Sequence, residues 1–99
     1  MHVVTVLFSI KPAHRVEFMA AVLENAQVSL ATEPGCTVFD VCESRTAEAC
    51  QVFLYEVYAT PEDFQMHLAA PHFQYFNTQT AAWVMDKKVS VFKRVLPSH

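Results

Sequence analysis

Two side chains of this 99-residue chain are the strongest candidates for acid–base and ligand-binding chemistry: His67 and Asn25. An imidazole with an ordinary pKa of about 6.5 exchanges protons at neutral pH, so His67 could act as a base or a hydrogen-bond donor. A structural role beside the break at Pro71 is the plainer alternative. A buried amide needs partners, so Asn25 could bind a ligand or form a tertiary hydrogen bond.

Glu56 is a third candidate for a catalytic group. It alternates with Tyr55 on an expected strand and lies near Asp40 in the expected hairpin register. Two carboxylates that lie close together could share a proton and act as acid and base. The plainer alternative is an ion pair between one of them and a lysine or arginine of a neighbouring strand or subunit.

Other residues could form the walls of a substrate pocket. His72 opens the helical segment that begins at Pro71, where it could cap the helix, contact the loop or bind a substrate. Aromatic residues at helical and strand spacing often form ordinary core, but five of them are candidates for substrate contacts: Tyr58, Phe53, Trp83, Phe73 and Phe76. One basic cluster could hold an anionic substrate or form a solvated strand edge: Lys87, Lys88, Lys93 and Arg94.

Motifs for metals and nucleotide cofactors are missing from the sequence. The five histidines are scattered, and His67 and His72 are five positions apart across a proline, which is a poor spacing for two ligands on one helix face. A single glycine excludes the G-x-G-x-x-G fingerprint of dinucleotide sites. The sequence therefore predicts neither a metal nor a cofactor.

Composition and charge exclude further classes. The formal net charge of −3 gives no electrostatic reason to expect nucleic-acid binding. No apolar run reaches the roughly 18–20 residues that cross a bilayer, and no signal peptide is visible. Three cysteines without a C-x-x-C pair predict reduced thiols, and the cytoplasm follows as the expected compartment.

Hydrophobic periodicity indicates the elements that must position these residues. We expect strands at 2–10, 36–44, 51–59 and 87–95, and helices at 13–32, 61–70 and 71–84. The order strand, helix, strand, strand, helix, strand predicts an α+β protein with a ferredoxin-like β-α-β-β-α-β sheet and all helices on one face. The length allows a single domain over residues 1–99.

The helix ends carry recognisable signals. Thr60, Pro61 and Asp63 are typical of the N-cap, N1 and N3 positions of a helix start. Gly35 follows the first helix, where a residue tolerant of positive φ is expected. Within that helix we expect two adjacent apolar rows to form one wide buried stripe: Val16, Met19, Ala20, Leu23 and Leu30 in one, and Phe18, Val22, Ala26 and Ser29 in the other.

The first and third strands carry apolar residues at both alternating positions. A sheet that is wet on one face should alternate apolar and polar residues, and these two strands do not. We therefore expect a second subunit to cover the face that the helices leave free, in a homodimer with a largely apolar interface. The residues concerned are Val3, Val4, Val6, Leu7, Phe8 and Ile10 in one strand, and Val52, Phe53, Leu54, Tyr55, Val57 and Tyr58 in the other.

Several short motifs follow one another in a recognisable order: Glu33-Pro34-Gly35-Cys36, Phe39-Asp40-Val41, Phe53 to Tyr58, His67, and Pro71-His72-Phe73. Over nearly the whole chain, from Met1 to about Val95, the sequence resembles the antibiotic biosynthesis monooxygenase family, in its quinol monooxygenase branch. The resemblance implies a dimeric α/β barrel. It also implies that His67 points into a cavity between the helices and the sheet.

The resemblance also brings in the chemistry of several relatives. Some oxidise quinols or phenols with O2 and no cofactor, some degrade haem, and one branch isomerises a phosphorylated autoinducer-2 breakdown product. His67 and Phe76 replace a Trp and a haem-ligating His of the haem degraders, and Ala26 replaces a His of the isomerases.

We therefore expect a cofactor-independent monooxygenase acting on a quinol or similar electron-rich aromatic with O2. Such a substrate must lose a proton before it can pass an electron to O2, which requires a base, hydrogen-bond donors and a dry pocket. His67, Asn25 and Glu56 are the expected catalytic groups. The alternatives are an isomerase of a small phosphorylated dicarbonyl and a non-catalytic barrel module.

Overall fold

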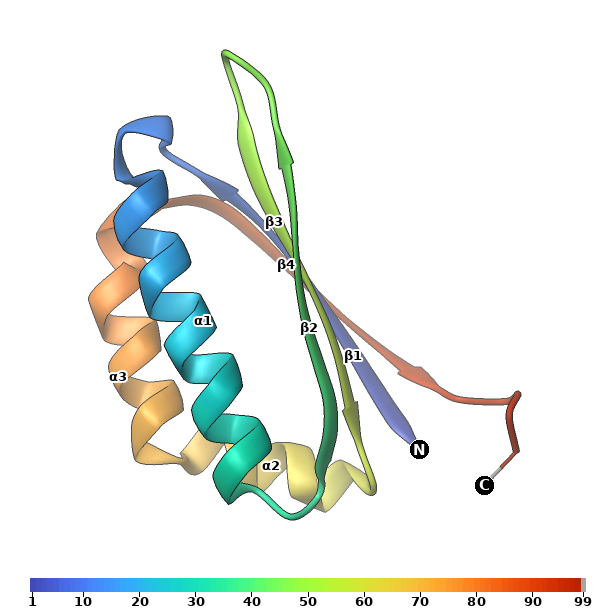
Figure 1. Ribbon diagram of the computed structural model, residues 1–99. Helices are drawn as coiled ribbons and strands as arrows, with labels where there is room; N and C mark the ends of the chain where they lie inside the picture. The colour runs from blue at the N-terminus through green and yellow to red at the C-terminus, as the bar shows by residue number, and fades with distance from the viewer. Residues whose placement is uncertain (99) are drawn as a thin grey trace.

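The computed structural model describes residues 1–98, so His99 lies outside the described part of the chain. Four antiparallel strands form one sheet in the order β2-β3-β1-β4, and the helices pack on one of its faces (Figure 1). This arrangement confirms the ferredoxin-like α+β fold. The elements are β1 (His2–Ile10), α1 (Arg15–Thr32), β2 (Cys36–Arg45), β3 (Cys50–Tyr58), α2 (Pro61–Ala69), α3 (Pro71–Thr80) and β4 (Val84–Lys93), with short 3-10 turns at Pro12–His14 and Ala81–Trp83.

The last strand begins earlier than the sequence indicates. β4 starts at Val84, which pairs with Ile10 across a register shift at the end of β1. The backbone N–H of Lys11 donates to the carbonyl of Trp83 at 3.0 Å. These long-range backbone contacts extend the strand into a segment whose local pattern is helical.

Only one of the two expected rows of α1 is buried. Phe18, Val22, Ala26 and Ser29 face the sheet, whereas Val16, Leu23 and Leu30 are exposed. The expectation of one wide stripe was wrong, because a helix lying on a sheet buries only a limited arc of its circumference. The buried row also contains Asn25, so it carries two polar side chains into the core.

The start of α2 is tied to the end of α1. Asp63 N–H donates to Thr60 Oγ1, which confirms Thr60 as the N-cap, and Thr60 N–H donates to Asp63 Oδ2, which completes a capping box; each distance is 3.1 Å. A Cβ at Gly35 would lie 2.1 Å from Cγ of Asp63, so glycine is required there for close approach. It is not required for positive φ, because no described glycine has one. The turn after α1 therefore seats the α2 N-terminus against it.

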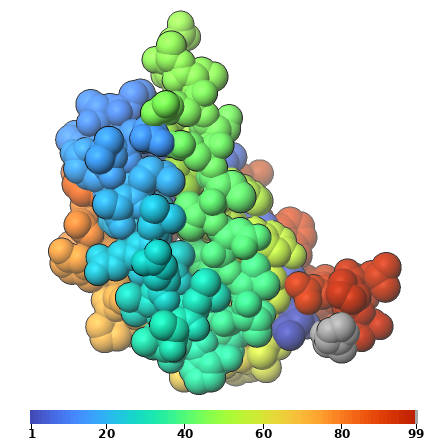
Figure 2. Space-filling view, in the orientation of Figure 1, coloured from blue at the N-terminus to red at the C-terminus, as the bar shows by residue number. Residues whose placement is uncertain are grey.

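Helices pack on one face of the sheet and leave the other face uncovered. Under the helices, Phe8, Phe18 and Phe76 form edge-to-face contacts in the core. On the other face, Leu7 of β1 and Phe53 of β3 lie opposite each other and are exposed. Figure 2 shows the β2–β3 hairpin tip standing out beyond the start of α1.

The three cysteines of the chain are free thiols, as the sequence predicts. Among the described residues, no helix combines the length and the apolar character needed to cross a membrane.

Candidate functional site

A cavity of about 220 Å³ lies between the covered face of the sheet and the helices. Its walls are mostly apolar and aromatic, with a few polar side chains among them, which is typical of small-molecule sites. The lining residues are Val6, Phe8, Asn25, Phe39, Leu54, Glu56, Phe64, His67, Leu68, Phe73, Phe76, Lys87 and Val89.

Three residues expected to be catalytic, His67, Asn25 and Glu56, all line this cavity. They come from α2, α1 and β3, and their exposed fractions are 2%, 4% and 3%. Among the described residues, the side-chain oxygen of Asn25 has no hydrogen-bond partner. A buried polar atom without a partner is costly, so a ligand in the cavity would meet an unsatisfied amide.

Glu56 is buried beside a tyrosine. Tyr58 O–H donates to Glu56 Oε1 at 2.6 Å, yet burial raises the pKa of Glu56 to about 7. Burial and the nearby Glu56 also raise the pKa of Tyr58. The β2–β3 pairing sets Tyr55, not Glu56, opposite Asp40, so the two carboxylates do not form the expected pair. Within the described chain Glu56 forms no ion pair, and an ion pair with a partner subunit stays a prediction.

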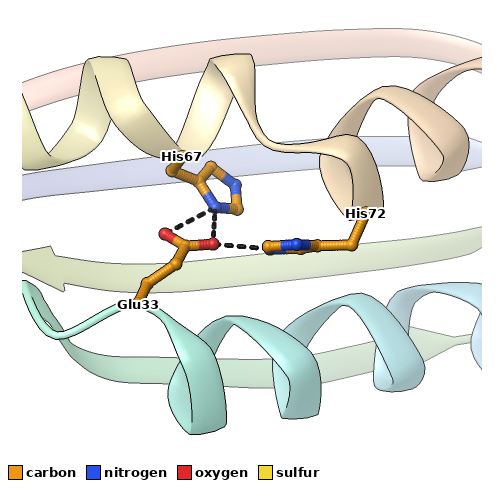
Figure 3. Close-up of side chains that lie close together, drawn as sticks. All are labelled: Glu33, His67 and His72. Carbon is orange, nitrogen blue, oxygen red and sulfur yellow. Dashed lines mark hydrogen bonds and ion pairs between the residues drawn. The ribbon is translucent and has the colours of Figure 1, made fainter.

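His67 belongs to a polar cluster with Glu33 and His72, shown in Figure 3. The ring nitrogen Nδ1 of His67 lies 2.9 Å from Glu33 Oε2 and 3.1 Å from Oε1. His72 Nε2 lies 2.5 Å from the same Oε2. Burial lowers the pKa of His67, against the raising effect of the hydrogen bond to Glu33. The imidazole is therefore neutral at neutral pH and able to accept a proton.

The same cluster has nitrogen and oxygen atoms that could bind a metal cation. Its ligand atoms lie within 4.8 Å of one another, which a single divalent ion could bridge. Each imidazole already lies within hydrogen-bond distance of the carboxylate. One proton on His67 Nδ1 and one on His72 Nε2 therefore complete the arrangement without an ion.

The remaining expected pocket residues lie in three kinds of position. Phe73 and Phe76 line the cavity, and the Tyr58 ring lies 5.6 Å from the ring of His67 without lining it. Phe53, on the uncovered face, and Trp83, which stacks on His14, lie outside the cavity. Strand alternation turns Phe53 away, because its neighbours Val52 and Leu54 point into the core.

The basic residues do not act as one cluster. Lys87 alone lines the cavity, with Nζ 5.6 Å from the Phe8 ring centroid and 5.9 Å from that of Phe73. Lys88 follows on the strand, and alternation turns it to the opposite face. The cavity therefore offers one cation to a ligand.

Sequence reasoning missed Glu33 and Ser29 as parts of the site. Ser29 Oγ lies 3.1 Å from His72 Nε2 and 3.4 Å from His67 Nδ1. Ser29 belongs to the buried row of α1, but Glu33 is the C-cap of that helix, in a turn motif with no chemical signal. No local pattern links Glu33 to two histidines more than thirty positions away.

Many solved structures share this fold. A protein from Nitrosomonas europaea, provisionally named an antibiotic biosynthesis monooxygenase, is 26% identical with a TM-score of 0.90, over 99% of this chain and 93% of that chain. Provisionally named monooxygenases from Bacteroides thetaiotaomicron (24% identity, TM-score 0.88, 99% and 92% covered) and Deinococcus radiodurans (18%, 0.87, 100% and 97%) support the fold alone.

Two sequence comparisons gave different outcomes. No curated protein matches the chain significantly. The family model described as antibiotic biosynthesis monooxygenase matches residues 1–79. Membership suggests oxidoreductase chemistry of the monooxygenase type. Because the match covers well over half of its length, this chain belongs to the antibiotic biosynthesis monooxygenase family.

Proposed function

We propose that this protein is a cofactor-independent monooxygenase that oxidises a quinol or a similar electron-rich aromatic with O2. The observation that carries the proposal is a buried, neutral imidazole at the wall of an apolar cavity. Its Nδ1 is engaged by Glu33, which leaves Nε2 for a substrate. Family membership supports the same class of reaction.

The cavity sets the size and character of the substrate. Its volume of about 220 Å³ is below the roughly 300–1,000 Å³ of sites for drug-sized ligands, so a compact aromatic is the best match. Phe39, Phe64 and Phe73 offer aromatic contacts. The unpartnered side-chain oxygen of Asn25 can accept a hydrogen bond from a substrate hydroxyl, and the Lys87 ammonium favours the anion that forms on deprotonation.

The proposed reaction begins when the substrate O–H gives its proton to His67 Nε2. The resulting anion passes an electron to O2, and the two radicals combine as a carbon-bound peroxide. His67 returns the proton to the peroxide. The O–O bond then breaks as the ring C–H proton leaves, which yields a carbonyl and water. One O2 is reduced, the substrate is oxidised to a quinone, and both hydrogens of the water come from the substrate.

The direct test is O2 consumption by purified, chelator-treated protein with a panel of hydroquinones and naphthoquinols. We expect uptake above the buffer blank, and one atom of isotopically heavy O2 in the quinone product. Absence of uptake across the panel, or heavy oxygen in water alone, would contradict the proposal. Pretreatment with chelator distinguishes this reaction from catalysis by adventitious metal.

An isomerase of a small phosphorylated dicarbonyl is the second candidate. Lys87 favours it, because one cation faces the cavity and could meet a phosphate. Glu56, with a pKa of about 7, could move a proton beside a carbonyl. This candidate predicts turnover without O2, so the same assay under nitrogen separates the two reactions. A non-catalytic module predicts no turnover of either substrate.

We also infer that the uncovered sheet face forms a homodimer interface. Leu7 and Phe53 form an exposed apolar pair at its centre, and exposed Phe92 extends the patch on β4. Phe53→Lys should convert the dimer to monomer in light scattering. Gln51→Lys, two residues earlier on the same face of β3, is the matched control. A monomeric wild-type protein at micromolar concentration would contradict this inference.

A further inference from the structure

The geometry points to Glu33 and His72 as positioning residues that hold His67 in the tautomer with its proton on Nδ1. This assignment rests on the proposed function, because it makes Nε2 the atom that accepts the substrate proton. His67 alone contacts the cavity, whereas Glu33 and His72 act through it.

Hydrogen-bond accounting sets the tautomers. Ser29 O–H donates to the backbone carbonyl of Asn25 at 2.7 Å, so its oxygen lone pairs face the two imidazoles. The Glu33 carboxylate can only accept. Two acceptors therefore surround His67 Nδ1 and His72 Nε2, and each of these nitrogens must carry a proton. In neutral His67 the lone pair then lies on Nε2.

The position of Glu33 is unfavourable for a carboxylate on local grounds. It is the C-cap of α1, where the helix dipole is negative, and its side chain is only 13% exposed. A cation would suit that position better. Two imidazole N–H groups compensate for the placement, so the carboxylate stays in the wall and does not turn to solvent. A residue that breaks a local rule with dedicated partners is the pattern expected of a functional position.

The cluster spans the wall between two hollows. His67 lines the inner cavity, and Glu33 and His72 do not. Glu33 and His72 instead line an outer groove of about 260 Å³, together with Thr32, Pro34, Gly35, Asp63, Met66, Ala70 and Pro71. A small molecule can therefore replace the His72 ring from outside without entering the substrate cavity.

The positioning role leaves the proton balance of the reaction unchanged. Nδ1–H stays on His67 throughout and is shared with Glu33. Nε2 gains one proton from the substrate O–H and returns it to the peroxide. Glu33 stabilises the imidazolium between these two steps, in the manner of the acidic member of a catalytic triad.

Kinetics give the first test. Glu33→Gln should lower kcat by about 10²–10⁴-fold with KM changed by less than about threefold, because the imidazolium and its tautomer lose support while the cavity walls stay in place. Glu17→Gln is the matched control, since Glu17 also contacts a histidine but on the surface. Equal kcat values for the two variants would overturn the assignment.

Chemical rescue gives the second test. His72→Ala should lose about tenfold in kcat or more, and free imidazole should restore part of it through the outer groove. The KM for the quinol should not change. A loss that imidazole does not restore, with the fold intact by circular dichroism, would indicate a packing role and overturn the assignment for His72.

Nitrogen NMR of isotope-labelled histidine gives a readout that needs no substrate. We expect a proton on Nδ1 of His67 in the wild type and a shift towards the Nε2–H form in Glu33→Ala. A wild-type Nε2–H tautomer, or no change in the variant, would overturn the inference whatever the O2 assay shows. The expected tautomers without O2 uptake would instead reject the proposed function and leave the positioning of His67 standing.

Discussion

The two ends of α1 carry the same pair of residue types in different surroundings. At its start, His14 Nδ1 lies 3.0 Å from Glu17, and the side chains are 41% and 49% exposed. At its end, Glu33 lies 2.9 Å from His67 Nδ1, with 13% and 2% exposed. The distances are nearly equal, so burial is the main difference between the pairs.

Burial distinguishes the surface pair from the pair beside the cavity. At the surface, the hydrogen bond from His14 lowers the pKa of Glu17, and water solvates both groups. In the interior, burial dominates and lowers the pKa of His67 despite its carboxylate partner. The same two residue types therefore form an ordinary surface pair at one end and a neutral base beside a cavity at the other.

The largest expected effect comes from replacing His67, with His14 as the comparison. His67→Gln should lower kcat for quinol oxidation by about 10²–10⁴-fold, the usual range for loss of a general base. His14→Gln should change kcat by less than about twofold, because His14 lies at the surface and does not line the cavity. Steady-state O2 uptake measures both. Comparable losses in the two variants would show that burial does not distinguish the pairs.

The second prediction concerns Glu56, the other carboxylate of the cavity. Its folded pKa of about 7 lies above the ordinary 4.5, so its contribution to stability is complete below about pH 4.5. That contribution should be lost as the pH rises through about 7, at a cost of about 3 kcal/mol. Urea unfolding across this range should show the decline, and Glu56→Gln should remove it.

His67 acts in the opposite direction in the same experiment. Its folded pKa is lowered, so its contribution is present above the unfolded value of about 6.5 and lost as the pH falls. The difference between wild type and Glu56→Gln in the pH dependence of the free energy of unfolding isolates the contribution of the Glu56 carboxylate. A wild-type protein whose unfolding midpoint rises steadily from about pH 5 to 8, with the same slope in the variant, would contradict the pKa of Glu56.

A smaller effect, on the free energy of unfolding, is expected from removing the N-cap side chain of α2. α2, which carries His67, begins with the Thr60–Asp63 capping box, whereas α1 has no side-chain cap at His14. Thr60→Ala should therefore lower the free energy of unfolding by about 1 kcal/mol. Thr32→Ala is a suitable control, since its hydroxyl bonds only to a carbonyl within α1. Equal stability of the two variants would show that the capping box contributes little.

The smallest expected effect is at the surface pair itself. Glu17→Gln should leave the urea midpoint unchanged within error, because exposed ion pairs contribute little and salt screens them. A clear loss of stability, abolished by high salt, would show that the exposed pair matters more than its surroundings indicate.

Periodicity and end signals in the sequence were enough for most of the fold. They identified the strands and α-helices of the described residues, the break at Pro71 and the N-cap at Thr60, because neighbouring residues decide these features. The start of β4 at Val84 was missed, since pairing with Ile10 decides it. The choice between the two apolar rows of α1 was also missed, because docking against the sheet selects the buried one.

The candidate site divides in the same way. His67, Asn25 and Glu56 could be selected by residue type alone, and all three line one cavity. Phe53 and Trp83 were selected by type as well, but strand alternation and a turn place them elsewhere. Whether any of these residues acts on a substrate stays a prediction.

By itself, the sequence determined the order of the elements, because local propensity and periodicity depend on near neighbours. It also determined which polar residues lie within otherwise apolar segments. Only the tertiary structure decided which of those groups meet. Gly35 packs against Asp63, which seats α2 on the turn after α1 and brings Glu33 to His67. Such contacts depend on how separate elements dock, and no short stretch of residues encodes them.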